Sequence, residues 1–331
     1  PATQHRSLKR ALLGSAFCFV CPWDTMANAV SRLAFWRRKP GLSMGLKWPK
    51  ALQNVYPAIG LFLVLTWLEL GFGVTNNPRQ TAYIGLGMGA LAIVMALVFE
   101  KKAFCSSVCL VGRVSGMYAT AAPLEIRPRD QRVCDVCTSR ACLVGNDKGY
   151  ACPTGIDLGK ITSNTYCTQC TECFSSCPSL APAVRARPFG ADLSRTAHLK
   201  LDEAWLAVVL LTLTAFHGLS MTPAWESFTP GDQGVIDIMR GTLGMSRLSA
   251  FSIGMVVACA VPVVAYVATA GGAWLWIKGA RIRTQTGERL ATFRDVFVRF
   301  SMSILPVALF YHMAHNAMHM LMEGQELVPL L

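Results

Sequence analysis

Charged side chains are scarce in this chain of 331 residues. They make up 15% of the residues, whereas ordinary soluble domains carry about 25%. Hydrophobic residues make up 53% and gather in long apolar runs. The shortage of charge argues against an ordinary soluble domain and favours an α-helical membrane protein.

Acidic residues are the scarcer of the two signs, with 19 against 31 basic residues and a formal net charge of +12. Nucleic acid is one partner that a basic chain can bind. Here the basic residues bracket the apolar runs, which the positive-inside rule explains more simply. We therefore expect membrane lipid around the chain and no nucleic-acid partner.

Five apolar stretches predict transmembrane helices, because a span needs about 20 residues. They run over about residues 52–72, 82–99, 203–221, 249–277 and 300–322. On this topology 28 of the 31 lysines and arginines fall on one side, which the positive-inside rule assigns to the cytoplasm. Residues 11–21 are too short to span, and the chain begins with proline, so we expect further sequence upstream.

Residues 101–200 interrupt the apolar pattern and hold ten of the 13 cysteines. Glycines and prolines break any long periodicity there, so we expect a compact, loop-rich fold organised by metal. Reduced cysteines in such number favour the cytoplasmic side. The predicted organisation has an N-terminal membrane region (1–100), this inserted cytoplasmic domain (101–200) and a C-terminal membrane region of three helices (201–331).

The cysteines of this domain have the spacing of cluster ligands. The second half reads Cys-x2-Cys-x2-Cys-x3-Cys-Pro, a run that bacterial ferredoxins use for 4Fe–4S clusters. Three cysteines of such a run hold one cluster, and the fourth ligates the neighbouring one. Crossing the two halves predicts two clusters, one held by Cys152, Cys167, Cys170 and Cys173, the other by Cys134, Cys137, Cys142 and Cys177. Zinc and disulfides are the alternatives, although zinc sites usually consist of two Cys-x2-Cys pairs.

Two further cysteine pairs flank the first two predicted spans. Cys18 and Cys21 precede them, and Cys105 and Cys109 follow them. If these spans form an antiparallel hairpin, all four thiols lie at the same membrane face. There they would hold a third cluster or copper, act as two redox-active dithiols, or serve in packing.

This order of motifs resembles the membrane polyferredoxins, which include NapH-type and NosR-type proteins and a related protein of cytochrome oxidase assembly. The resemblance covers about residues 15–180: Cys-x2-Cys-Pro, two spans, Cys109 with Gly112 and Arg113, and then the double ferredoxin motif. In that family the membrane pairs are usually Cys-x3-Cys-Pro. Here the first has two intervening residues, and Leu110 replaces the proline after the second. The resemblance implies electron transfer in a bacterial inner (cytoplasmic) membrane between the quinone pool and a partner protein or complex.

Four of the six histidines fall in predicted spans. On the fifth span, His312, His315 and His319 share one face, because they follow the helical spacing i, i+3, i+7. His217 lies near the same end of the membrane on the third span. Such residues inside a membrane are functional by default. They would ligate haem b, bind copper together with nearby methionines, or accept protons from a quinol, whereas polar packing between helices is the alternative without function.

The sequence therefore predicts a membrane-bound iron–sulfur protein that relays electrons between a quinone pool or membrane redox site and a partner oxidoreductase. It would act as a quinol dehydrogenase-like electron-transfer subunit and not as an enzyme with bond chemistry of its own. The alternative is a copper-handling or metalloenzyme-maturation reductase that uses the membrane-face cysteine pairs. A purely structural subunit is disfavoured, because eight cysteines in cluster spacing are unsuited to an inert scaffold.

Overall fold

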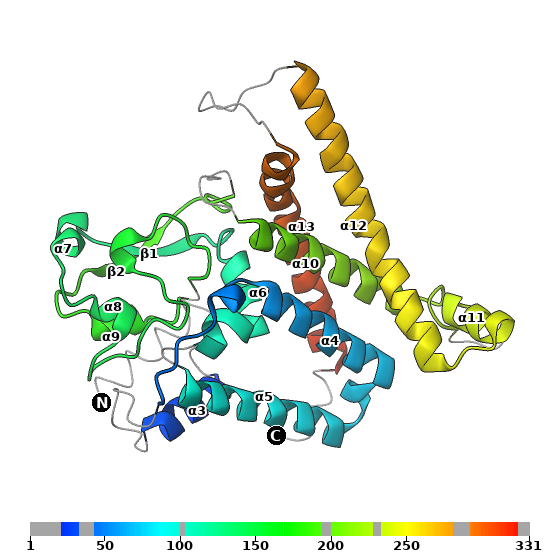
Figure 1. The fold of residues 1–331 in the computed structure, drawn as a ribbon, viewed down its shortest axis with the longest axis horizontal. Coiled ribbons are helices and arrows are strands. Elements are labelled where there is room, and N and C mark those ends of the chain that lie inside the picture. The colour runs from blue at the N-terminus through cyan, green and yellow to red at the C-terminus, as the bar shows by residue number, and fades with distance from the viewer. Residues whose placement is uncertain are drawn as a thin grey trace. The chain divides into compact units, whose positions relative to one another are not determined.

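The computed structural model describes residues 21–32, 43–99, 103–167, 169–193, 200–227, 233–280 and 292–323. The chain folds into two compact units. The first comprises residues 1–62 and 74–195, and the second comprises residues 63–73 and 196–331. Each unit is described by itself below, and Figure 1 shows the course of the chain through both.

Helices dominate the described part of the chain. Four helices are long and apolar enough to cross a membrane, namely α5 (Pro78–Val98), α10 (Leu201–Ser220), α12 (Arg247–Ala280) and α13 (Phe293–Glu323). The first of the five expected spans is α4 (Tyr56–Phe72), whose 17 residues fall short of the other four. At 1.5 Å per residue it would be about 25 Å long, against a hydrocarbon core of about 30 Å.

The outer surface of these helices is apolar. On α12 the exposed side chains include Val256, Val257, Val261, Val264, Leu275 and Trp276, each more than half accessible. A helix that is apolar all round and little buried in its own protein needs an apolar surrounding. The structure is therefore that of a helical protein suited to a membrane.

In the first unit, α5 packs along a short helix that the sequence did not predict, α3 (Pro22–Arg32). The indole Nε1 of Trp23 donates a hydrogen bond to the carbonyl oxygen of Gly85 at 3.1 Å. A β-carbon on Gly89 would lie 3.3 Å from the Trp23 ring. Gly89 thus allows α3 to pack closely against α5.

After α5 come η3 (Phe104–Val108), which is a π-helix, and α6 (Leu110–Tyr118). The cysteine-rich segment follows and is closed by an antiparallel pair of strands, β1 (Leu124–Pro128) and β2 (Pro182–Ala186). Between these strands lie only short elements: α7 (Gln131–Asp135), α8 (Ala141–Val144), η4 (Leu158–Lys160) and α9 (Glu172–Ser176). The other described 3-10 turns are η1 (Lys50–Leu52) and η2 (Val74–Asn76).

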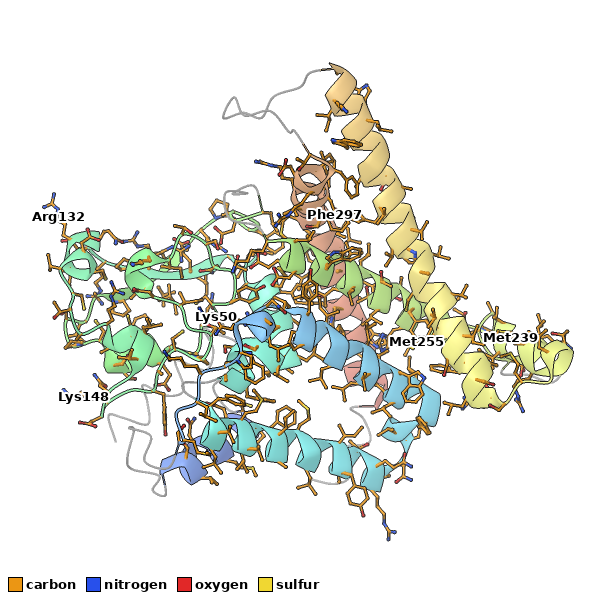
Figure 2. All side chains as sticks on the ribbon, in the orientation of Figure 1. Lys50, Arg132, Lys148, Met239, Met255 and Phe297 are labelled. Atoms are coloured by element: carbon orange, nitrogen blue, oxygen red, sulfur yellow. The ribbon has the colours of Figure 1, made fainter. Side chains whose placement is uncertain are left out.

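In the second unit, α10, α12 and α13 pack around apolar side chains that include Ala204, Val208, Ala270 and Phe297. Phe297, labelled in Figure 2, contacts the rings of Trp205 and Tyr266. At the other end of α10, Phe216 packs edge-on against the buried ring of Trp225, near α11 (Val235–Leu243). The last residues of α4 join this unit, because Trp67 Nε1 donates to Ser252 Oγ at 2.9 Å.

Candidate functional site

Eight cysteines of the first unit line two cavities. One cavity is lined by Cys152, Cys167, Cys170 and Cys173, together with apolar side chains such as Ile126, Ile156 and Ile161. The other is lined by Cys134, Cys137, Cys142 and Cys177, with Pro178 beside the last. Cys142 also lines the first cavity, so the cavities contain five and four cysteines with one shared. The fold therefore places Cys177 with the first half of the motif and Cys152 with the second.

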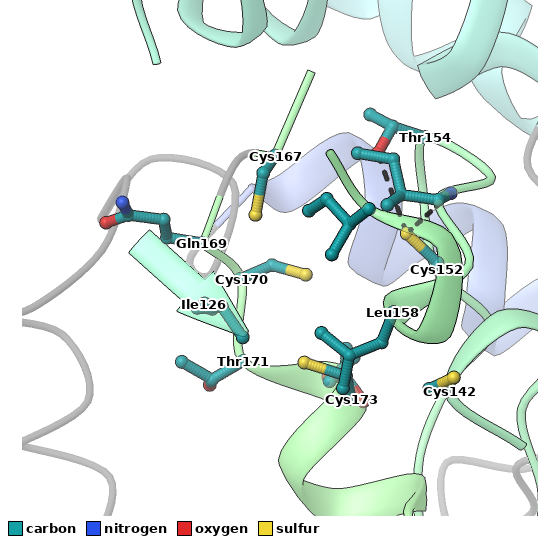
Figure 3. Close-up of a pocket in the computed structure, with 13 residues that line it drawn as sticks. Ile126, Cys142, Cys152, Thr154, Leu158, Cys167, Gln169, Cys170, Thr171 and Cys173 are labelled. Atoms are coloured by element: carbon teal, nitrogen blue, oxygen red, sulfur yellow. Dashed lines mark hydrogen bonds between the residues drawn. The ribbon is translucent and has the colours of Figure 1, made fainter. Parts of the chain in front are cut away.

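Figure 3 shows the first cavity, with Cys152, Cys167, Cys170 and Cys173 around it. The Sγ of Cys152 accepts a hydrogen bond from the backbone N–H of Ile156 at 3.3 Å and lies 3.6 Å from Thr154 Oγ1. Amide hydrogen bonds to sulfur stabilise thiolates over thiols. Such bonds also influence the potential of a cluster that the thiolates hold.

Cys142 and Leu158 belong to the walls of both cavities. Cys142 lies on α8, and Leu158 begins η4 and is 5% exposed. Figure 3 draws Cys142 at the edge of the group, with its sulfur directed away from the other thiols of that cavity. A thin, apolar wall therefore separates the two sites.

The loop between Cys167 and Cys173 has an unusual backbone. In the described residues, five non-glycine residues have a positive φ angle, and all lie between 140 and 180. Two of them flank Cys170, namely Gln169 at 52° and Thr171 at 64°. Left-handed backbone at side chains other than glycine costs about 1–3 kcal/mol and persists where the surrounding structure enforces it, often at functional sites.

A buried polar network holds the backbone just before this loop in place. Arg187 and Asp192 form an ion pair whose side chains are 6% and 1% exposed. The Asp192 carboxylate also accepts a hydrogen bond from the backbone N–H of Asn164 at 2.6 Å. In turn the Asn164 amide donates to the carbonyl of Leu124 on β1 at 2.8 Å. The loop is thus fixed to the strand pair three residues before Cys167.

The thiols of the first cavity are buried near one another. Burial raises the pKa of Cys167 to about 11, and the neighbouring thiol of Cys152 contributes to this increase. Burial also raises the pKa of Cys173, with further increases from Cys170 and Cys167. The neutral thiol is therefore favoured at these positions unless a positive charge lies in the cavity.

A single metal ion does not fit these groups as they are placed. In the described ranges, no three His, Cys, Asp or Glu side chains lie close enough together to hold one ion. Thiolates around one zinc are about 3.8 Å apart, because Zn–S is about 2.3 Å. A cubane binds its cysteines at separate corners and spaces them more widely than a zinc ion does. No disulfide bond joins any two of the twelve described cysteines.

The membrane-face cysteines also gather in the first unit. Cys21 precedes α3, Cys105 lies within the π-helix η3, and Cys109 caps the N-terminus of α6, where its Sγ accepts from the N–H of Gly112 at 3.5 Å. The Sγ of Cys105 lies 3.7 Å from a carboxylate oxygen of Asp24. Burial raises the pKa of the Cys109 thiol, and the nearby charges of Cys21 and Asp24 add to the increase.

Cys18 lies outside the described residues. The other three thiols lie in the first unit near α3, a helix that the sequence did not predict. Asp24 was missed as a neighbour of these thiols. The signal was present, because Pro22 at the first position of a helix and an acid in its first turn are typical of a helix start.

Two of the four membrane histidines lie side by side in the second unit. The rings of His217 on α10 and His315 on α13 are 5.6 Å apart between centroids. His312 lies one turn earlier on α13. The side chain of His319 lies outside the described part of the chain.

Comparison of the chain with protein-family models, with curated proteins and with solved structures gives no match. The function must therefore be argued from the residues and their placement.

Proposed function

We propose that this chain is a membrane-bound iron–sulfur electron-transfer protein of the polyferredoxin type, with two 4Fe–4S clusters in a ferredoxin-like segment. The observation that supports it best is the distribution of eight cysteines over two cavities, with Cys142 in the wall of both. Each cavity draws ligands from both halves of the motif, as the ferredoxin pattern requires. Zinc sites and disulfides would not need this crossing.

When bound, the clusters supply one-electron redox chemistry. The residues of the chain hold the thiolates, exclude water and separate the two sites by a wall that includes Leu158. Ile126, 3% exposed, and Ile156 give the first cavity an apolar lining. Burial and hydrogen bonds to sulfur are the factors by which a protein sets cluster potential.

The redox partner is proposed to dock on the basic side of the cysteine-rich segment. Arg129 and Arg132 are exposed just before Cys134, and Figure 2 shows Arg132 and Lys148 extending from the surface. Arg127 precedes them in the sequence, but it is 9% exposed and its guanidinium donates to Asn164 Oδ1 at 3.2 Å. Guidance of an acidic protein therefore falls to the two later arginines. A quinone in the membrane and an inner-membrane location, with this segment on the cytoplasmic side, belong to the same proposal.

The decisive experiment is metal analysis of the purified full chain together with low-temperature EPR. The proposal requires about eight iron atoms and matching sulfide per chain, which is two 4Fe–4S clusters. On reduction, EPR should show two interacting S = 1/2 centres. Zinc in place of iron, or a single cluster that survives Cys170→Ser, would overturn it.

The second candidate function is a copper-handling or maturation reductase that uses the membrane-face cysteines. It is favoured by the gathering of Cys21, Cys105 and Cys109 around Asp24. In that case the same three thiols would form a third metal site or exchange electrons as dithiols. Rapid oxidation of a quinol analogue by the purified protein would favour the first function, and slow oxidation with copper bound at these thiols would favour the second.

A further inference from the structure

The two helices α10 and α13 enclose a histidine pair that the iron–sulfur function does not use. The imidazoles of His217 and His315 are tilted by 58° with their centroids 5.6 Å apart. Both side chains are half-buried. The two helices belong to the same unit and pack along each other, so this pair is set by their contact.

The orientation of His217 is fixed by a backbone hydrogen bond. Its Nδ1 lies 2.8 Å from the carbonyl oxygen of Leu213, one turn earlier on α10. A carbonyl can only accept, so Nδ1 carries the proton and Nε2 keeps its lone pair. Metal-binding histidines have this arrangement, in which the outer nitrogen donates to a carbonyl and the inner one faces the ion.

A haem does not fit between these helices. Gly218 follows His217, and a β-carbon on Gly218 would overlap the hydroxyl of Tyr311. The helices therefore touch one residue away from His217 and one turn away from His315. A flat macrocycle between the two imidazoles would have to push the two helices apart, whereas a single ion would not.

The separation of the rings suits one small ion. With metal–nitrogen bonds of about 2.0 Å, two imidazoles on one trigonal ion have their centroids about 5.5 Å apart. Two thioethers lie close in sequence to the pair, because Met221 caps the end of α10 four residues after His217 and Met318 lies one turn after His315 on α13. Both methionine side chains are partly exposed, at 42% and 39%, and so have room to adjust.

The charges of the residues on α10 and α13 indicate which ion the pair would bind. Between Ala204 and Ser220 α10 has no acidic residue, and α13 has none between Val296 and Met322. Nearby Glu226 is paired with Arg247 at 2.9 Å. A neutral ligand set leaves the full charge of the ion in an apolar surrounding, and the cost of burying charge rises with its square. A monovalent ion is therefore favoured, and imidazole with thioether selects copper.

We propose that His217 and His315 bind one Cu(I) ion, with a thioether from Met221 or Met318 as the third ligand. The site is separate from the cysteine cavities and does not rest on the proposed electron-transfer function. It adds a copper-binding function to the membrane-spanning part of the chain.

The test is a Cu(I) titration of the purified full chain against a chromogenic Cu(I) chelator under anaerobic conditions. Cysteine thiols are first blocked by alkylation, so that they do not compete. One equivalent of tightly bound copper is expected, and His217→Leu and His315→Leu should each weaken binding by at least tenfold. His217→Met keeps a soft ligand at the same position and should retain most of the affinity.

Folding is monitored by the elution profile of each variant in detergent and by its iron content before alkylation. Met318→Leu combined with Met221→Leu should weaken binding, whereas Met313→Leu, two residues from His315 and 57% exposed, serves as the matched control. Equal affinity in the wild type and the two leucine variants at His217 and His315 would overturn the proposal. A haem signal in the pyridine assay that disappears in those variants would overturn it as well.

Discussion

The α-carbon of Tyr166 lies 2.6 Å from the position that a β-carbon on Gly116 would occupy. The Tyr166 N–H donates to the Gly116 carbonyl at 2.7 Å, and the Arg113 guanidinium lies 4.5 Å from the centre of the Tyr166 ring. These contacts join α6, which begins at the buried Cys109, to the loop that contains Cys167. The membrane-face cysteine Cys109 and the first cysteine cavity are therefore linked through α6.

Gly116→Ala should displace this loop. The added methyl meets backbone atoms, which cannot rotate away as a side chain can, and Cys167 is the next residue. We expect loss of about half of the bound iron, because one of two 4Fe–4S clusters depends on that loop. Gly60→Ala is the matched control, since no atom lies within 4 Å of the new methyl. Iron content by mass spectrometry measures both, and full iron in Gly116→Ala would contradict the expected displacement.

The crossed pairing predicts which cysteine substitutions share an effect. Cys177→Ser alone should lower the iron content. The triple variant with Cys134→Ser and Cys137→Ser should contain as much iron as the double variant without Cys177→Ser, because all three cysteines belong to one cavity. Added to Cys170→Ser with Cys173→Ser, Cys177→Ser should remove the remaining half. The opposite pattern in the iron content of these five variants would mean that Cys177 serves the cluster of its own sequence run.

Asp192→Asn should destabilise the cysteine-rich segment. The substitution leaves the charge of Arg187 buried, with Glu125 at 3.6 Å as the remaining acid. Loss of one partner of a buried ion pair costs about 3–5 kcal/mol. Asp130→Asn is the control, because asparagine caps a helix as well as aspartate does and Asp130 is an exposed cap of α7. Thermal unfolding and protease resistance of the segment are the measurements, and equal midpoints in the two variants would refute the structural role.

Gly218→Ala should loosen the packing of α10 on α13. The methyl would overlap the Tyr311 hydroxyl, and overpacking of this kind costs about 1–3 kcal/mol. Tyr311→Phe removes the hydroxyl, so the double variant should recover much of the lost stability. Melting temperatures of the four proteins in detergent give the coupling between the two sites. Additive effects would show that the two side chains do not meet.

Long apolar runs made the membrane-spanning helices predictable. The ends of α10, α12 and α13 lie within a few residues of the expected limits, except at the start of α13. Its first turns carry Arg294, Asp295 and Arg299, and this charge hid them from a search for apolar residues. The placement of α4 was correct, but its helical part is shorter than expected, because Lys50–Leu52 form a separate 3-10 turn.

Cysteine spacing predicted two ligand groups of four, and in the fold the eight cysteines line two cavities that share Cys142. The spacing said nothing of the residues that hold the loops in place. The network of Asn164, Arg187 and Asp192 joins positions up to 28 residues apart with no periodic signal. The contact between Gly116 and Tyr166 likewise depends on the tertiary fold. Helical spacing placed His312, His315 and His319 on one face, whereas the meeting of His315 with His217 required knowledge of how α10 lies on α13.

The strand pair affects how the cysteine-rich segment could be inserted into another protein. Leu124 pairs with Ala186, and the N–H of Arg187 donates to the carbonyl of Pro123 at 2.8 Å, so the chain enters and leaves at one place. A host protein could therefore accept the cysteine-rich segment as an insertion at a single surface turn. A transplanted stretch would have to run from Gly116 to Asp192, because Gly116 contacts Tyr166 and Asp192 pairs with the buried Arg187.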